Sequence, residues 1–159
     1  MGRGEMAAEV NRIDIRFPAR PENVAVARAA VASAASVLPF TLAEVEELRI
    51  AVSEAVSNAV LHAYGPEGGE VEVAVEVDGG GVAVCVADRG RGIADVERAR
   101  RPDFSTLEGH LGLGFAFLAA MTDELEVASE VGRGTRIRFV KRPQAEPGEE
   151  PSGDAAGGA

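Results

Sequence analysis

The chain has 159 residues, of which 46% are hydrophobic and 26% are charged, and its formal net charge is −10. The length is typical of one domain and the composition is typical of a folded globular chain. The acidic balance argues against a protein that binds nucleic acid through its phosphates, because such binding needs clustered cations. The single cysteine allows no internal disulfide and fits a reducing compartment. Without a signal-peptide pattern or a run of about 18 apolar residues, we expect a cytoplasmic protein with no membrane contact.

The first half of the chain is predicted to form one strand and two helices. Residues 10–17 alternate apolar and polar side chains, which predicts a strand with one buried face. Residues 21–37 begin with a proline, continue with alanine and valine and precede another proline, which favours a helix. Thr41 and Glu44 form a T-x-x-E capping box, and apolar residues recur from there at helical spacing as far as Tyr64.

The second half is predicted to form two hairpins separated by a loop and a helix. Valines alternate with other residues on both sides of Asp78-Gly79-Gly80-Gly81, which predicts a hairpin. The further elements expected in chain order are a short helix over 94–100, a mobile loop over 101–111, an apolar helix over 113–122 and a second hairpin with strands 124–129 and 135–140.

These elements predict an α+β two-layer sandwich with a mixed, mostly antiparallel sheet that helices cover on one face. The folded domain is expected over 10–141, after an N-terminal extension over 1–9. Residues 142–159 are rich in Pro, Gly and Glu and carry four carboxylates and one arginine, which predicts a disordered acidic tail.

Three polar residues share one stripe of the long helix. Glu54, Asn58 and His62 follow one another at i, i+4 spacing, beside the apolar face. Each of them alone fits the solvated side of an amphipathic helix. The stripe is of interest because two glycine-rich motifs come after it in the chain.

The first of these motifs is Asp88-Arg89-Gly90-Arg91-Gly92, at the end of a strand predicted to be buried. By itself D-x-G is also a common turn. The second is G-x-x-G-x-G over 109–114, where backbone amides and a helix N-terminus suit a polyphosphate. Its glycine order is not that of the dinucleotide-binding fingerprint, and no P-loop motif occurs.

Together with Gly134-Thr135, these motifs resemble the ATPase fold shared by gyrase, Hsp90, histidine kinases and MutL. Within that superfamily, the segments SEAVSNAVLHAY, DRGRGI, ARRPDFST and LGLGF resemble the bacterial anti-sigma-factor serine kinases of the sporulation type. The resemblance covers 10–141. It departs from the family pattern where the segment between Thr106 and Gly112 is about two residues shorter and where His110 or its neighbour replaces an arginine.

The resemblance implies ATP and Mg²⁺ as ligands. Asn58 would bind Mg²⁺ and Glu54 would be the general base toward a serine hydroxyl. Asp88 would accept from the adenine amino group, beside Gly90 and Gly92 and supported by Thr135. The phosphates would lie against Gly112, Leu113 and Gly114, with Arg100 or Arg101 near them.

The same resemblance implies protein partners. These are a sigma factor, which the chain would inhibit, an anti-anti-sigma protein, which it would phosphorylate on serine, and a second copy of the chain. Arg28 would contact both of the other proteins, although it also fits a solvated helix arginine. Two alternatives stay open: an ATP-binding anti-sigma module without kinase activity, and a general-stress anti-sigma kinase.

Overall fold

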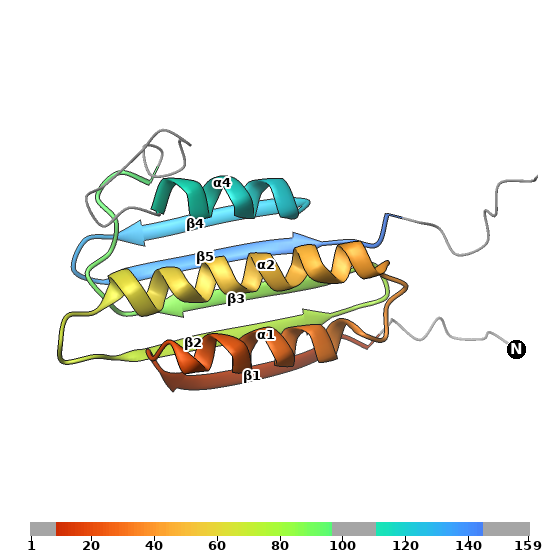
Figure 1. Ribbon diagram of the computed structural model, residues 1–159, viewed down its shortest axis with the longest axis horizontal. Coiled ribbons are helices and arrows are strands. Elements are labelled where there is room, and N and C mark those ends of the chain that lie inside the picture. Colours follow the sequence, from red (N-terminus) through yellow and green to blue (C-terminus); the bar gives the residue numbers. More distant parts are fainter. Residues whose placement is uncertain (1–8, 97–110, 145–159) are drawn as a thin grey trace, which may run out of the picture.

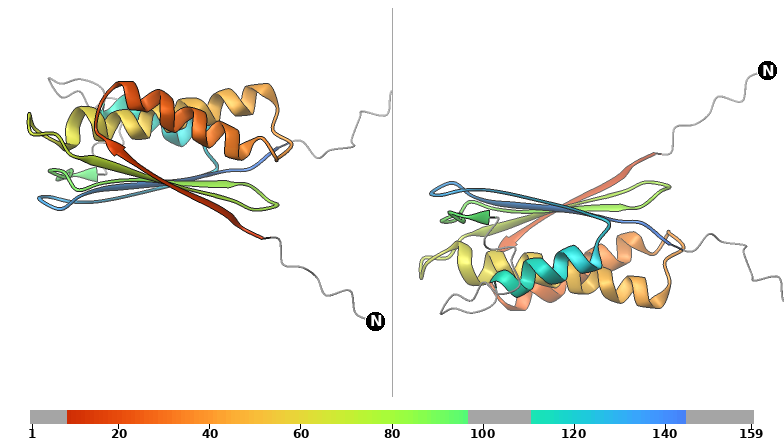
Figure 2. Two further views of the ribbon diagram at one scale, coloured as in Figure 1. Left: turned by 90° about the horizontal axis from the view of Figure 1, so that it is seen from below. Right: turned by 90° about the horizontal axis from the view of Figure 1, so that it is seen from above.

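The computed structural model describes residues 9–96 and 111–144, which form one sheet with helices against one of its faces (Figure 1). Both side views in Figure 2 show every helix on the same side of the sheet. The elements in chain order are β1 (Asn11–Pro18), α1 (Glu22–Ala35), α2 (Leu42–Asn58), the π-helix η1 (Ala59–Ala63), β2 (Glu70–Val77), β3 (Val82–Asp88), α4 (Leu111–Met121), β4 (Glu124–Glu130) and β5 (Gly134–Lys141). The predicted α+β sandwich is confirmed.

The sheet has five strands in the order β1-β2-β3-β5-β4. Every neighbouring pair is antiparallel. The sheet is therefore fully antiparallel, whereas the sequence predicted a mixed, mostly antiparallel one. The two predicted hairpins are the pairs β2–β3 and β4–β5. Since β5 inserts between β3 and β4, the end of β3 lies beside the beginning of β5, and this brings Asp88 close to Thr135.

The predicted capping box starts α2. The Thr41 hydroxyl accepts from the backbone N–H of Glu44 at 3.1 Å, and the Glu44 carboxylate accepts from the backbone N–H of Thr41 at 2.8 Å. The helix was expected to continue to Tyr64 as one α-helix. Instead, its last turn widens into η1, so the chain reaches Tyr64 with a different helical phase.

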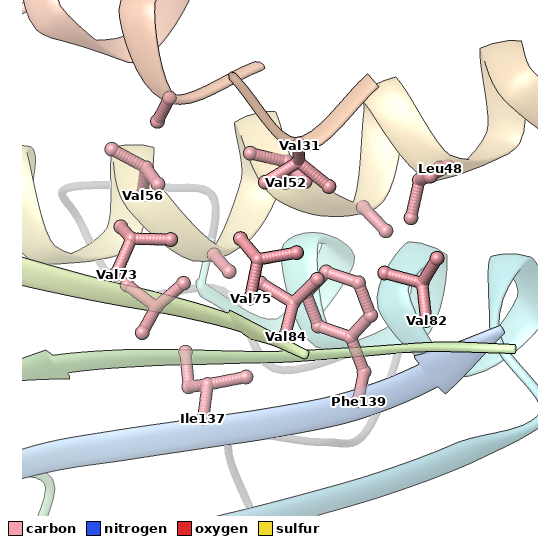
Figure 3. Packing of buried hydrophobic residues seen from close by; sticks show 14 of the residues in the cluster. Val31, Leu48, Val52, Val56, Val73, Val75, Val82, Val84, Ile137 and Phe139 are labelled. Carbon is pink, nitrogen blue, oxygen red and sulfur yellow. The ribbon is translucent and has the colours of Figure 1, made fainter. Parts of the chain in front are cut away.

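The core fills the space between the helices and the covered face of the sheet (Figure 3). The alternating valines of β2 and β3 point into it and are at most 4% exposed. Val31 of α1 and Val52 of α2 meet them from the helix layer. Burial of each such side chain stabilises the fold by roughly 1.5–3 kcal/mol. Apolar residues therefore recur at the spacing that places them on the buried face of each strand or helix, and this spacing is the pattern seen in the sequence.

Two predicted boundaries differ in the structure. Helix α4 begins at Leu111, two residues before the predicted start, and therefore includes Gly112. Arg142 and Gln144 were assigned to the tail, but they are tied to the domain: the backbone N–H of Arg142 donates to Asp123, and that of Gln144 donates to Glu44 at 2.9 Å. Apart from Leu111, which belongs to α4, the predicted loop at 101–111 lies outside the described residues, as do most of the predicted helix at 94–100 and the rest of the tail.

Among the described residues, no helix is long and apolar enough to cross a membrane.

Candidate functional site

The polar stripe of the long helix faces the beginning of α4. Glu54, Asn58 and His62 line one small cavity of about 30 Å³ together with Gly114 and Leu118. The first two come from the last turns of α2 and the third from η1. The stripe therefore does not point at open solvent, and two motifs that are far apart in the sequence meet at this place.

Gly114 is the closest point of that meeting. A Cβ atom built on it would lie 3.0 Å from Glu54 Oε2, closer than nine in ten real contacts of a Cβ atom. The absence of a side chain at Gly114 thus lets the Glu54 carboxylate lie against the first turns of α4. The backbone of Gly112 and Leu113 belongs to the first turn of this helix, where N–H groups have no partner within the helix and are suited to an anion.

Asp88 is a buried carboxylate at the end of β3, with 9% of its surface exposed. Its Oδ1 accepts from the backbone N–H of Gly90 at 2.9 Å and from that of Thr135 at 3.3 Å. Burial raises the pKa of Asp88, and the two hydrogen bonds oppose that effect without cancelling it. Both bonds hold the same oxygen, Oδ1, which fixes the orientation of the carboxyl group.

The loop after Asp88 is clamped from two sides. The backbone N–H of Arg91 donates to the Ala63 carbonyl at the end of η1 at 2.8 Å, and that of Gly132 donates to the Arg91 carbonyl at 2.9 Å. Gly92 has φ +72°, a conformation that favours glycine, and a Cβ atom on it would overlap the Glu130 carbonyl. The D-x-G-x-G segment is therefore a packed junction between helix and sheet, and it is more than a surface turn.

Sequence reasoning missed two hydroxyl groups that complete this junction. Tyr64 donates to the Glu70 carbonyl at 2.5 Å and accepts from the backbone N–H of Arg89 at 2.9 Å. Ser129 accepts from the backbone N–H of Ile93 at 2.7 Å, and its Oγ lies 2.8 Å from Thr135 Oγ1. Isolated hydroxyl residues carry no periodic signal, so only the β4–β5 pairing of Ser129 with Thr135 could have indicated this role.

The predicted site residues form two groups in the described structure. Glu54, Asn58 and Gly114 line the small cavity, whereas Asp88 and Thr135 line a hollow of about 750 Å³ at the end of the sheet. The contact between Ala63 and Arg91 joins the two groups through η1.

Arg28 belongs to neither group. Its Nη1 donates to Ser53 Oγ at 3.2 Å, between α1 and α2.

No group of three or more His, Cys, Asp or Glu side chains that could hold a metal is found within residues 9–96 and 111–144. The side-chain oxygen of Asn58 is nevertheless a hard ligand beside the small cavity. One such oxygen fits Mg²⁺, which usually keeps several waters and substrate phosphates and takes only one or two protein oxygens.

Comparisons with known proteins identify the family to which the chain belongs. The family described as "Histidine kinase-like ATPase domain" matches residues 17–141. The anti-sigma F factor of Pasteuria penetrans is 42% identical over 139 residues, which is 85% of this chain and 93% of that protein. The anti-sigma F factor of Clostridium acetobutylicum is 38% identical over 135 residues, or 83% and 94% of the two chains.

Among solved structures, the RsbU and RsbW domains of a Mycobacterium tuberculosis protein match with a TM-score of 0.61 at 22% identity. The match covers 83% of this chain and 32% of that one, and it supports the fold.

Proposed function

Because the chain belongs to the anti-sigma F factor family and carries the histidine kinase-like ATPase domain, we propose that it is an ATP-dependent serine-protein kinase and anti-sigma factor. It would bind and inhibit a sporulation-type sigma factor and phosphorylate the anti-anti-sigma antagonist of that factor on serine. The observation that carries this proposal is the meeting of Glu54, Asn58 and Gly114 at one cavity beside the N-terminus of α4.

Glu54 is the proposed general base. Its carboxylate lies against the backbone of α4, where the γ-phosphate of ATP would be held by free N–H groups. The serine hydroxyl of the substrate protein would lose its proton to Glu54 while its oxygen bonds to the γ-phosphorus, and the bond from that phosphorus to ADP would break. Glu54 thus accepts the proton, and α4 holds the phosphate in line.

Asn58 would hold Mg²⁺ through its side-chain oxygen, one helical turn from Glu54. When bound, the metal would neutralise charge on the transferred phosphate. Replacement of Asn58 is therefore expected to abolish ATP binding.

Asp88 is proposed to select adenine. Gly90 and Thr135 already donate to Oδ1, which leaves Oδ2 for the amino group of the base. A carboxylate held in this way accepts from adenine and repels the carbonyl oxygen that guanine has at the same place. Gly92 would bring backbone close to the base, and Ser129 would hold Thr135 in position.

The partners follow from the same proposal. The acidic chain suits a sigma factor that offers basic surface, and Arg28 lies on the helix layer as a candidate contact for both protein partners. We place this activity in the cytoplasm and expect a homodimer.

The test is to incubate the purified chain with labelled ATP, Mg²⁺ and a candidate anti-anti-sigma protein. Phosphoserine should appear with the wild type, whereas Glu54→Gln should bind ATP and transfer nothing. Wild-type ATP binding without phosphoserine would favour a second candidate, an ATP-binding anti-sigma module without kinase activity. The shortened segment between Thr106 and Gly112 favours that candidate.

A further inference from the structure

One hydroxyl group links the beginning of β2 to the chain just after Asp88. In Figure 1 the end of the long helix, the beginning of β2 and the end of β3 lie at the same end of the sheet. There Tyr64, the first residue after η1, donates from its hydroxyl to the Glu70 carbonyl at 2.5 Å. The same oxygen accepts from the backbone N–H of Arg89 at 2.9 Å. A side chain therefore joins β2 to the residue that follows Asp88.

This hydroxyl takes the place of a hydrogen bond between the strands. Opposed residues of an antiparallel pair alternate between bonded and non-bonded pairs. The backbone N–H of Asp78 donates to the Gly81 carbonyl at 3.2 Å beside the turn, which makes these two residues a bonded pair. The register from there is unbroken, and Glu70 and Arg89 lie an even number of steps away, so alternation predicts a direct bond between them. Instead, both backbone groups bond to the inserted Tyr64 hydroxyl.

The Tyr64 ring is held in place by packing. A Cβ atom built on Gly69 would overlap three atoms of the ring, so the ring lies directly against the backbone of Gly69. The ring is also partly buried and packs against the core. The carbonyl of Gly69 accepts from the backbone N–H of Ala19 at 2.8 Å, which ties this part of the chain to the end of β1. The position of the hydroxyl is therefore set by backbone at the beginning of β2.

The peptide between Asp88 and Arg89 is held by two elements. The Tyr64 hydroxyl accepts from its N–H, and a Cβ atom built on Gly134 would overlap its carbonyl oxygen, so the beginning of β5 also lies against it. The next N–H along the chain, that of Gly90, donates to the Asp88 carboxylate at 2.9 Å. Because the carboxyl group is bonded to an N–H so close in the chain, its orientation depends on where this peptide is held.

We infer that Tyr64 is a positioning residue for the base of the nucleotide: its hydroxyl keeps the end of β3 apart from β2 and so sets the direction of the Asp88 carboxylate. Without the hydroxyl, the Arg89 N–H and the Glu70 carbonyl can bond directly, which draws the residue after Asp88 toward β2. The inference rests on the proposed role of Asp88 as acceptor from the adenine amino group. The groups proposed to hold the phosphates belong to α4 and α2 and do not contact this hydroxyl.

A purely structural role of Tyr64 predicts a different result. A lower fraction of folded chain weakens the apparent affinity for every nucleotide by the same factor. A displaced Asp88 carboxylate weakens only the contact with the exocyclic amino group of adenine. Purine riboside triphosphate lacks that amino group and is otherwise identical to ATP. The ratio of the two affinities therefore separates positioning from stability.

The experiment measures the affinities of the full chain for ATP and for purine riboside triphosphate by calorimetry, with Mg²⁺ and without a substrate protein. The wild type should bind ATP more tightly. Tyr64→Phe should weaken ATP binding about tenfold, the usual effect of one lost hydrogen bond to a charged group, and should leave the affinity for purine riboside triphosphate unchanged. Thr122→Val is the matched control, because it also removes a hydroxyl that donates to a backbone carbonyl, at 2.6 Å. Thr122 precedes β4, whereas Thr135 pairs with Ser129 near the end of that strand.

Gly69→Ala moves the same hydroxyl without removing it. The new Cβ atom would overlap the Tyr64 ring, so the ring has to shift and its hydroxyl shifts with it. This variant should show the same selective loss of ATP affinity. Gly65→Ala, whose Cβ atom meets nothing within 4 Å, should bind both nucleotides as the wild type does. The two variants act on one group by different changes, so a Tyr64→Phe chain that fails to fold does not prevent the test.

An unchanged ratio of affinities in either variant that folds would overturn the inference, whether both affinities stay the same or fall together. If the wild type prefers ATP in that case, the proposed role of Asp88 stands and only the role of Tyr64 is refuted. A wild type that binds both nucleotides equally would overturn the role of Asp88 and the inference with it. Because no substrate protein is present, none of these outcomes depends on whether the chain phosphorylates serine.

Discussion

Gly114→Ala tests whether the position of the Glu54 carboxylate controls phosphoryl transfer. The added Cβ atom would lie 3.0 Å from Glu54 Oε2, so one of the two groups has to move by a few tenths of an ångström. The carboxylate is at the end of a flexible side chain and moves at little cost. Alanine also favours a helix over glycine by about 0.5–1 kcal/mol. The free energy of unfolding should therefore stay the same or rise.

The rate of transfer should fall instead. A misplacement of about 1 Å can cost about 100-fold in rate, so a displacement of a few tenths of an ångström is expected to cost about tenfold. Affinity for ATP should change less, because the backbone N–H groups of α4 are unaltered. The assays are urea unfolding, ATP binding and phosphoserine formation with a candidate anti-anti-sigma protein. Gly65→Ala is the control, since a Cβ atom there meets nothing within 4 Å.

The combination with Glu54→Asp separates this explanation from a general distortion of α4, because this variant keeps a carboxylate on a shorter side chain. If the alanine acts by displacing the Glu54 carboxylate, Gly114→Ala should slow transfer much less in the Glu54→Asp background than in the wild type. An unchanged rate in Gly114→Ala, or an equal loss in both backgrounds, would refute the reasoning.

Three further predictions concern buried ionisable groups. Lys141 is 5% exposed and donates to Glu47 at 2.7 Å and to the Met121 carbonyl at 2.8 Å. Lys141→Met should therefore lower the free energy of unfolding, measured by urea titration, by about 1–3 kcal/mol. The same loss in the exposed control Arg49→Met would contradict this prediction. Burial raises the pKa of Asp88 above its ordinary 3.8, so the stability that this group contributes is present below pH 3.8 and is lost as the pH rises through its folded pKa. In Asp88→Asn the free energy of unfolding should no longer fall over this pH range, and ATP binding should be abolished. A free energy of unfolding that depends on pH as in the wild type would contradict this prediction. Burial also acts to raise the pKa of Glu44, but the hydrogen bonds from Thr41 and Gln144 outweigh it and lower the pKa below 4.5. The stability that Glu44 contributes is therefore present above pH 4.5 and is lost as the pH falls through its folded pKa. In Glu44→Gln the free energy of unfolding should fall less steeply at acid pH than in the wild type, and an equally steep fall would refute the prediction.

The elements that local chemistry specifies could be predicted from the sequence. The capping box at Thr41 and the alternating valines of the hairpins depend on neighbours within a few residues, and both are in the structure. The antiparallel direction of the two hairpins follows from their short turns, but the pairing of β1 with β2 and of β5 with β3 could not be settled in this way. These pairings depend on the order of the strands in the sheet, which the pattern of any one strand does not encode.

The candidate site was predictable as a set of motifs but not as a geometry. Glu54 and Asn58 share a face because they are one helical turn apart, and that much follows from spacing. The approach of Gly114 to Glu54 depends on the packing of α4 against α2, and in the sequence these helices are separated by η1, two strands and residues 89–110. The roles of Tyr64 and Ser129 likewise arise only from tertiary contacts.

The π-helix η1 sets the rotational phase with which the chain leaves the long helix. A π-turn is in effect one residue inserted into an α-helix, and one residue corresponds to about 100° of rotation. Deletion of one residue within Ala59–Ala63 would restore the α-helix and turn Tyr64 away from Glu70 and the backbone of Arg89. The Ala63 carbonyl would turn away from Arg91 as well. The angular relation between the Asn58 end of the helix and the Asp88 end of the sheet is thus adjusted by a single residue.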